Sequence, residues 1–400
     1  MKLCIAGKGN IAVDCLQFFL KVLDKKDIFV ILNNNDNFKN TWMKSLGFYA
    51  NLEGIKIVKL EDVYLIEDLL FLSLEFDKII NPKKFKSSNL YNIHFSLLPD
   101  YKGVYTSLLP ILHGKDFSGI SFHKIDNGID TGDIIFQEKI DINNTTTCRE
   151  LYFKYLINGA NLIIENFNEI INGNFKSIKQ NPINSFYYSR NSINILQKEI
   201  NLFQSAFQIQ RNVNAFIFRE YQLPTINGIQ INKVIILEER SKEKPGKIVF
   251  ENDEKLIINT IDFNIIVIKD YYDELIKCAR ENNVKRAEKI IDYIPDINET
   301  EKNGWTPLII ASFYGSYDII NLILKKGALI NKTNLNGTTP LMYAKELAIE
   351  NDDFQCLSLL IKNNADKLKK DVWGKSIFDY LDLNKHSKLI NFLNDSLSYD

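Results

Sequence analysis

A short sequence block in the last third of the chain occurs twice, with a spacing of 33 residues. Residues 303–308 read Asn-Gly-Trp-Thr-Pro-Leu, and residues 336–341 read Asn-Gly-Thr-Thr-Pro-Leu. Threonine before proline suits the start of a helix, because threonine caps free backbone N–H groups and proline fits the first turn. A repeat of this period constrains the fold strongly, since each unit buries its apolar side against the next. We therefore expect a stack of helical repeats.

The period and the Thr-Pro-Leu turn resemble those of ankyrin repeats. A weaker copy of the block begins at Trp373, and residues 326–331, Lys-Gly-Ala-Leu-Ile-Asn, have the composition that ends such a repeat. Residues 273–299 are expected to form a first repeat. The resemblance implies an all-α ankyrin domain over residues 269–400, with an atypical repeat at its end.

The beginning of the chain follows a different pattern. Short apolar segments alternate with helix-like stretches, which predicts a parallel sheet covered by helices. The continuous apolar run at residues 29–32 is typical of a strand buried on both faces. We therefore expect an α/β fold, a Rossmann-like core with a mixed or parallel sheet. The strands are expected at residues 2–6, 28–32, 55–59 and 78–81. Helices are expected at residues 11–23 and 65–72, and the start of another at residues 41–47.

The middle of the chain predicts longer helices and then a small β-rich subdomain. Helices are expected at residues 145–176 and 193–220, the first opened by a capping box of Thr147 and Glu150. Residues 229–268 contain short β segments separated by turn signals. The expected domains are a core at 1–190, a helix with the β-rich subdomain at 191–268, and the repeats at 269–400.

Charge and composition argue against several classes of protein. The sequence has 49 Lys and Arg residues against 50 Asp and Glu residues, whereas nucleic-acid-binding proteins usually carry a clustered basic surface. No segment approaches the roughly 18 apolar residues of a membrane-spanning helix. The five cysteines are scattered, which argues against disulfides and a zinc site and favours a reducing compartment. We expect a cytoplasmic protein without a nucleic-acid, membrane or metal partner.

Three segments of the core hold polar side chains in an order typical of one enzyme family. Residues 92–99 read Asn-Ile-His-Phe-Ser-Leu-Leu-Pro, residues 119–123 read Gly-Ile-Ser-Phe-His, and residues 126–134 read Asp-Asn-Gly-Ile-Asp-Thr-Gly-Asp-Ile. The series resembles the formyltransferases that use N10-formyltetrahydrofolate, whose motif is Asn-x-His-x-Ser-Leu-Leu-Pro followed by Asp-x-Gly. The resemblance covers roughly residues 1–240. It implies an N-formyltransferase with N10-formyltetrahydrofolate as co-substrate.

Asn92, His94 and Asp130 match the three catalytic positions of this family. On a strand, residues 92 and 94 point to the same face, so both side chains meet one reacting centre. The Asn92 amide suits stabilisation of the oxyanion, and His94 suits the removal of a proton from the attacking amine near neutral pH. Asp130 is expected to orient the imidazole, raise its basicity or relay protons. A lone histidine is more often a buried structural group; we expect this of His123, whereas the motif favours catalysis by His94.

Two further segments are expected to bind the substrates. By resemblance, a loop before residues 79–82 binds the pterin through its backbone. The residues expected at the folate are Leu74, Glu75, Phe76 and Asp77. The turn after the first strand opens a helix and suits an anion, although a plain tight turn fits it equally well. The residues expected at the nucleotide sugar from these two segments are Lys8, Gly9, Asn10, Lys78 and Lys83.

The end of the predicted helix at 193–220 indicates the acceptor. Residues 214–224, Asn-Ala-Phe-Ile-Phe-Arg-Glu-Tyr-Gln-Leu-Pro, resemble an element of the enzymes that formylate dTDP-linked amino sugars. The resemblance implies a dTDP-linked amino-dideoxy sugar, used for surface polysaccharide (the O-antigen of lipopolysaccharide), with Tyr105 and Tyr221 at the substrate. It leaves open whether the amine is at C3 or C4. The alternatives are a formyltransferase for another amine, and an ankyrin interaction protein on an inactive formyltransferase scaffold.

Two expectations concern association and regulation. A small sheet has too little mass to cover its own faces, and with the family resemblance this predicts a homodimer through residues 229–268. Trp305 and Tyr314 lie in the repeats, where an exposed indole is costly unless it is covered. Either Trp305 packs against the catalytic core, or it forms with Tyr314 a second, non-catalytic site for the nucleotide sugar.

Overall fold

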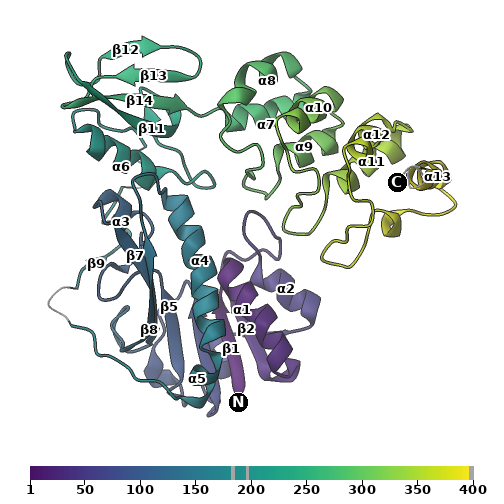
Figure 1. Cartoon of the computed structure of the whole chain (residues 1–400). Coiled ribbons are helices and arrows are strands. Elements are labelled where there is room, and N and C mark those ends of the chain that lie inside the picture. Colours follow the sequence, from purple (N-terminus) through teal and green to yellow (C-terminus); the bar gives the residue numbers. More distant parts are fainter. Residues whose placement is uncertain (182–184, 195–197, 396–400) are drawn as a thin grey trace. The chain divides into compact units, whose positions relative to one another are not determined.

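The computed structural model describes residues 1–181, 185–194 and 198–395, which form two compact units (Figure 1). The first unit comprises Met1–Lys39, Met43–Phe250 and Leu256–Val267. The second comprises Asn40–Trp42, Glu251–Lys255 and the chain from Ile268 onward. Within the described ranges, no helix has both the length and the apolar character needed to cross a membrane.

A seven-stranded sheet forms the centre of the first unit, in the order β3-β2-β1-β4-β5-β7-β8. Its strands are β1 (Lys2–Gly7), β2 (Ile28–Leu32), β3 (Lys56–Ile57), β4 (Leu69–Leu74), β5 (Leu90–His94), β7 (Phe117–Lys124) and β8 (Ile134–Asp141). The pairs from β3 to β5 are parallel, whereas β7 is antiparallel to both β5 and β8. The sheet is therefore mixed, which confirms the expected α/β core.

Two long helices lie side by side on one face of this sheet, α1 (Gly9–Val22) and α4 (Cys148–Glu165) (Figure 1). Gly159 permits their close approach, since a Cβ on it would lie 2.8 Å from Ile11 of α1 and 3.5 Å from Ile93 of β5. On the opposite face, Leu60 and Val63 of the 3-10 helix η2 (Leu60–Val63) and Phe85, which follows the 3-10 helix η3 (Pro82–Lys84), pack in one apolar cluster with strand residues. The smaller elements are η1 (Lys25–Asp27), α2 (Leu46–Glu53), β6 (Lys102–Gly103), α3 (Leu109–Leu112), α5 (Phe167–Asn172) and β9 (Tyr187–Tyr188).

One segment of the sheet differs from the sequence prediction. The helix predicted at residues 65–72 is wrong, because β4 begins at Leu69. All six residues of β4 are buried, so its apolar run is that of a strand covered on both faces, and the helix preference of leucine misled the prediction. Residues 78–81, predicted as a strand, form none.

The start of α4 agrees with its predicted capping box. The Thr147 side chain accepts from the backbone N–H of Glu150, whose carboxylate accepts from the N–H of Thr147. The helix predicted over residues 145–176 is nevertheless divided. Asn166, with φ −99° and ψ 20°, leaves the helical region and separates α4 from α5.

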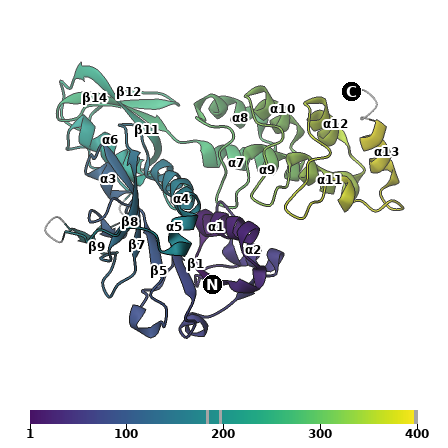
Figure 2. The ribbon, with the colours of Figure 1, turned by 60° about the horizontal axis from the view of Figure 1, so that its bottom comes forward.

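A second sheet, in the order β10-β11-β14-β13-β12, packs against α6 (Ala206–Phe216) (Figure 2). Its strands are β10 (Thr225–Ile226), β11 (Ile229–Arg240), β12 (Ile248–Glu251), β13 (Lys255–Ile258) and β14 (Phe263–Lys269), as the β-rich segment predicted. The helix expected over residues 193–220 is shorter, since a capping box at Ser205 begins α6. Residues 195–197 of that prediction lie outside the described residues.

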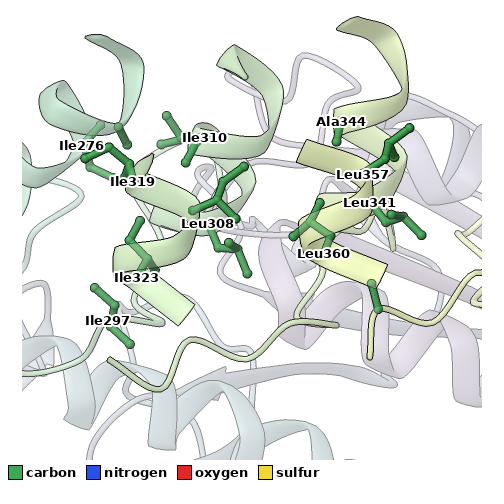
Figure 3. Close-up of a cluster of buried hydrophobic side chains, with 14 of the residues drawn as sticks. Ile276, Ile297, Leu308, Ile310, Ile319, Ile323, Leu341, Ala344, Leu357 and Leu360 are labelled. Atoms are coloured by element: carbon green, nitrogen blue, oxygen red, sulfur yellow. The ribbon is translucent and has the colours of Figure 1, made fainter. Parts of the chain in front are cut away.

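The second unit consists of helix pairs, as the 33-residue period predicted. They are α7 (Tyr272–Glu281), α8 (Val284–Ile290), α9 (Pro307–Tyr314), α10 (Tyr317–Lys325), α11 (Pro340–Asn351) and α12 (Gln355–Lys362), followed by α13 (Ser387–Asp395), with η5 (Ile291–Tyr293) and η6 (Phe378–Tyr380) between them. The Thr306 and Thr339 side chains cap α9 and α11. Figure 3 shows how apolar side chains such as Leu308, Ile319 and Leu357 fill the space between successive helices.

Candidate active site

Two catalytic candidates, Asn92 and His94, lie on β5 and point to the same face of the sheet. Asn92 and His94 alternate with Ile93, whose side chain packs towards α4. His94 Nε2 lies 2.8 Å from the carbonyl oxygen of Tyr101. A carbonyl only accepts hydrogen bonds, so Nε2 carries the proton of the neutral ring and Nδ1 keeps a lone pair. The basic atom of this site is therefore Nδ1 of His94.

Asp130 faces this nitrogen, with its Oδ2 at 3.4 Å from His94 Nδ1. Burial lowers the pKa of His94, and the Asp130 carboxylate opposes that shift. Burial alone would raise the pKa of Asp130, but His94, His123 and the backbone N–H of Gly103 together hold it well below its usual range. At neutral pH the pair is thus a neutral imidazole beside a carboxylate, ready to accept one proton.

His123 of β7 orients the amide of Asn92. The two residues are opposite each other in the β5–β7 ladder, and Asn92 Nδ2 lies 3.0 Å from His123 Nε2. His123 Nδ1 donates to the carbonyl oxygen of Lys124 at 2.8 Å, so Nε2 is the acceptor of the amide proton. Asn92 Nδ2 also lies 3.5 Å from Asp130 Oδ1. The geometry therefore brings His123 into contact with the group of Asn92, His94 and Asp130.

The backbone around Asp130 is held in an uncommon conformation. Its φ of 54° is in the left-handed region, which is uncommon for non-glycine residues, although aspartate tolerates it better than most. One fixing contact comes from β6, because the N–H of Gly103 donates to Asp130 Oδ2 at 2.9 Å. The preceding residues of the same segment supply the Tyr101 carbonyl at His94. Residues 101–103 thus contact both members of the pair.

These groups open into a cavity of about 940 Å³, a volume typical of small-molecule sites. Segments far apart in the sequence meet in its wall. The predicted residues that line it are Asn92, His94, Asp130, Glu75, Phe76, Asp77, Lys8, Lys78, Tyr105 and Tyr221. Among the described residues, no three His, Cys, Asp or Glu side chains gather into a group that could hold a metal ion.

The predicted ligand residues that do not line this cavity are Leu74, Gly9, Asn10 and Lys83. The side chain of Leu74 is fully buried in the sheet. Asn10 Oδ1 accepts the backbone N–H of Lys44 at 2.9 Å, so it holds a neighbouring loop. Lys83 is exposed in η3. Contacts with distant segments therefore decide which residues of these loops face the cavity.

Glu75 is a partly buried acid in the cavity wall. The hydroxyl of Tyr152 lies 2.9 Å from both of its carboxylate oxygens. Burial raises the pKa of Glu75, and both Lys8 and the Tyr152 hydrogen bond oppose that shift. Its backbone carbonyl accepts from Asn33 Nδ2 at 2.9 Å. The loop is therefore fixed on both its main chain and its side chain by the protein itself.

Sequence reasoning did not single out Tyr152 or Tyr101 and expected only a structural role for His123. A signal existed for His123, because it ends the segment 119–123 that accompanies the motif, and an antiparallel pairing with β5 would place it beside Asn92. No local pattern marks Tyr152 or Tyr101. Tyr152 contacts Glu75 from helix α4, and Tyr101 contacts His94 through its backbone carbonyl.

In the second unit, Trp305 packs within an aromatic cluster. Its ring centroid lies 4.6 Å from that of Tyr343 and 5.3 Å from that of Phe313. Tyr314 contacts Phe313, with 5.1 Å between centroids, and is half exposed. Because Trp305 itself is only partly buried, the repeats carry an accessible aromatic surface around these two predicted residues.

Two family models match parts of this chain. A formyl transferase model matches residues 70–166, and a model of three ankyrin repeats matches residues 275–371. Among curated proteins, the methionyl-tRNA formyltransferase of Ureaplasma parvum is 33% identical over 221 residues, which are 53% of this chain and 70% of that protein. The methionyl-tRNA formyltransferase of Clostridioides difficile is 26% identical over 288 residues, 68% of this chain and 91% of that protein.

Two solved structures are similar at higher identity. WlaRD, a sugar 3N-formyltransferase solved with dTDP and 5-N-formyl-THF, is 48% identical with a TM-score of 0.63, over 67% of this chain and 97% of that one. The N-formyltransferase of Helicobacter canadensis, solved with folinic acid and dTDP-3-aminofucose, is 46% identical with a TM-score of 0.64, over 68% of this chain and all of that one.

Proposed function

Since this chain belongs to the formyltransferase family, we propose that it transfers the formyl group of N10-formyltetrahydrofolate to the amine of a dTDP-linked amino-dideoxy sugar. The observation that carries the proposal is the meeting of Asn92, His94 and Asp130 at one cavity. An inactive scaffold would not need a basic nitrogen 3.4 Å from a largely buried carboxylate, because such an arrangement is costly to maintain.

The chemistry is a proton-coupled exchange of one C–N bond for another. The amine nitrogen of the sugar attacks the formyl carbon, and its proton moves to Nδ1 of His94. The imidazolium is then stabilised by Asp130, whose Oδ2 is 3.4 Å away. The bond between the formyl carbon and N10 breaks, and the proton passes from His94 to N10. General acid–base groups of this kind typically contribute a factor of roughly 10² to 10⁴ in rate.

Asn92 stabilises the oxyanion that forms on the formyl oxygen. One N–H of its amide is engaged by His123 at 3.0 Å, which fixes the plane of the amide. The contact from Asn92 Nδ2 to Asp130 is long, at 3.5 Å, and is readily exchanged for the formyl oxygen as negative charge develops. A donor that is fixed before the reaction has little reorganisation to undergo in the transition state.

The acceptor is a 3-amino sugar carried by dTDP. The two solved structures reported above, at 48% and 46% identity, were solved with dTDP and with dTDP-3-aminofucose. In this chain, the rings of Phe218 and Tyr221 are 4.8 Å apart at the cavity, and an aromatic pair suits contact with a thymine ring. Lys8 and Lys78 in the same wall supply positive charge for a diphosphate. Use of the product in surface polysaccharide, implied by the family resemblance, is part of the same proposal.

A second part of the proposal is a homodimer through the five-stranded sheet. Its edge strand β12 is exposed at every residue, including Ile248, Val249 and Phe250. An exposed apolar edge strand has free backbone N–H and C=O groups that can pair with a strand of another chain. Light scattering at micromolar concentration is expected to give twice the mass of the chain, and a monomer would contradict this part alone.

Formyl transfer from N10-formyltetrahydrofolate to three acceptors tests the function. These are a dTDP-3-amino-dideoxyhexose, its 4-amino isomer and methionyl-tRNA, the last because the curated relatives are methionyl-tRNA formyltransferases. We expect kcat/KM to be roughly tenfold or more higher with the 3-amino sugar than with the 4-amino isomer. Preference for methionyl-tRNA would replace the proposed acceptor, and preference for the 4-amino isomer would move the amine to C4.

A further inference from the structure

A segment late in the first unit, residues 177–180, runs along the loop that carries Asp130. Ile178 exchanges two backbone hydrogen bonds with Ile134, each 2.8 Å long. Ser177 Oγ donates to Asp133 Oδ2 at 3.2 Å. No residue of this segment lines the cavity, so its contacts act on the loop and not on a ligand.

Gln180 reaches from this segment to the main chain on either side of Thr131. Its Nε2 lies 2.9 Å from the carbonyl oxygen of Asp130 and 2.7 Å from that of Gly132. Both protons of the amide are therefore used. Asp130 has a φ of 54°. The orientation of its carbonyl is set by the rotation about ψ, so the hydrogen bond from Gln180 restricts that rotation.

The opposite end of the same amide offers a second observation. Oε1 of Gln180 is buried and has no hydrogen-bond partner in the part of the chain that the structure describes. An unsatisfied buried carbonyl costs stability. A side chain of the same length without that oxygen would avoid the cost, so the two donated hydrogen bonds are what Gln180 contributes.

We propose that Gln180 is a positioning residue that holds Asp130 in its left-handed conformation and thereby sets the contact between Asp130 and His94. The inference rests on the proposed pairing of His94 with Asp130 in formyl transfer. It concerns the geometry of the base and not the identity of the acceptor. Loss of both hydrogen bonds frees the loop, and the Asp130 carboxylate moves away from Nδ1.

The consequence for pH follows from the groups that act on His94. Burial lowers the pKa of His94, and His123 and Lys102 lower it further, whereas the Asp130 carboxylate and the hydrogen bond to the Tyr101 carbonyl raise it. If Asp130 moves away, the pKa of His94 falls further. The acid limb of kcat/KM then shifts to lower pH while the plateau falls, since a displaced carboxylate stabilises the imidazolium less.

The substitution Gln180→Met tests this, because methionine keeps the length and removes both donors and the unsatisfied oxygen. We expect kcat to fall about tenfold to a hundredfold. Thermal stability should fall only slightly, because the loss of two donated hydrogen bonds is partly offset by removal of the unsatisfied oxygen. Gln210→Met is the matched control, since Gln210 Nε2 also donates to a backbone carbonyl, of Val234 at 3.0 Å, far along the chain from the loop. Its kcat and pH profile should be those of the wild type.

Two further measurements keep the test decisive. In an Asp130→Asn background, Gln180→Met should change kcat less than about twofold, because it acts through the carboxylate. An NMR titration of His94 without substrates should give a lower pKa in Gln180→Met than in the wild type, whichever acceptor proves correct. An unshifted pKa and a wild-type kcat in Gln180→Met would overturn the proposal, as would a full additional loss in the double variant.

Discussion

The two units of this protein treat the left-handed backbone region differently. In the repeats, the described non-glycine residues with positive φ are Asn282, Asp352 and Asn364, side chains that tolerate this conformation well. In the catalytic unit, Tyr101 with φ 54° and Tyr105 with φ 62° adopt it as well, and for bulky residues the conformation is strained. A third bulky residue of this unit, Phe38 with φ 61°, does not line the cavity, whereas Tyr105 does and the Tyr101 carbonyl contacts His94.

Buried polar groups show the same contrast. In the repeats they serve local needs: Thr306 caps the helix that follows it, and the Ser316 hydroxyl donates to the carbonyl of Ala279 in a neighbouring helix. In the catalytic unit, His94 and His123 are buried, and side chains from other segments, Asp130 and Asn92, contact their rings. One unit uses buried polarity to define helix ends, the other to hold a reactive group. Substitutions in the two units should therefore affect different observables.

The largest expected effect is on turnover, in the catalytic unit. His94→Asn, Asp130→Ala and Asn92→Ala should each lower kcat by roughly a hundredfold or more. They remove the proton acceptor, the carboxylate that stabilises its charged form and the oxyanion donor, respectively. Steady-state kinetics and circular dichroism check this together. Asp130→Asn is the control for backbone strain, since asparagine tolerates positive φ better than alanine. A native fold with near-wild-type turnover in His94→Asn would remove the proposed mechanism.

The next largest effect is expected in the pH dependence of kcat/KM, which depends on the catalytic unit through His94. The base is the neutral form of His94, so kcat/KM should fall as pH falls through its pKa. Burial depresses that pKa below the ordinary value of 6.5, and the Asp130 carboxylate only partly restores it. The acid limb of kcat/KM should therefore have its midpoint below 6.5, measured with substrate whose own titration is known. A midpoint clearly above that value would mean that Asp130 dominates over burial.

In the repeats, removal of one cap should change stability alone. Thr306→Ala deletes the acceptor of the Ile309 N–H and should lower the free energy of unfolding by about 1 kcal/mol. Thr339→Ala is the matched variant in the next repeat, where the acceptor serves Met342. Denaturant unfolding of the full chain measures both. A loss of kcat at permissive temperature in either variant would break the separation between the two units.

Trp305 is expected to affect ligand binding with almost no effect on turnover. We propose that the accessible aromatic surface of Trp305 and Tyr314 binds a second nucleotide sugar, so Trp305→Ala should reduce the number of bound nucleotides per chain from two to one in a calorimetric titration. The kcat should change less than about twofold, since no catalytic group is altered. Trp373→Ala, at another exposed indole of the same unit, is the control. An unchanged stoichiometry with lower thermal stability would leave Trp305 a packing role only.

The sequence was most informative where function and fold depend on local spacing. The alternation of Asn92 and His94 on one strand, and the caps at Thr306 and Thr339, follow from neighbours in the chain. The helix predicted at residues 65–72 failed because a fully buried strand and a buried helix have the same apolar run. Whether a loop residue faces the cavity depends on contacts that local patterns do not contain.

Gln180 illustrates that limit. Its hydrogen bond to Asp130 spans 50 residues, and nothing in the residues around position 180 marks it as part of the site. Likewise, His123 becomes informative only once its strand is paired with β5. Residues that react can be recognised from a motif, whereas residues that hold them in place are recognised only from the folded chain.

The segment at residues 177–180 also has a consequence for how the protein is made. Asp130 leaves the ribosome 50 residues before the glutamine that holds it, a delay of about 3 to 10 s at usual rates of synthesis. During that time the nascent chain contains Asn92, His94 and Asp130 but not yet Gln180. The site therefore cannot reach its final geometry before residue 180 has been made, and the last residues that line its cavity, Phe218, Tyr221 and Gln222, follow later still.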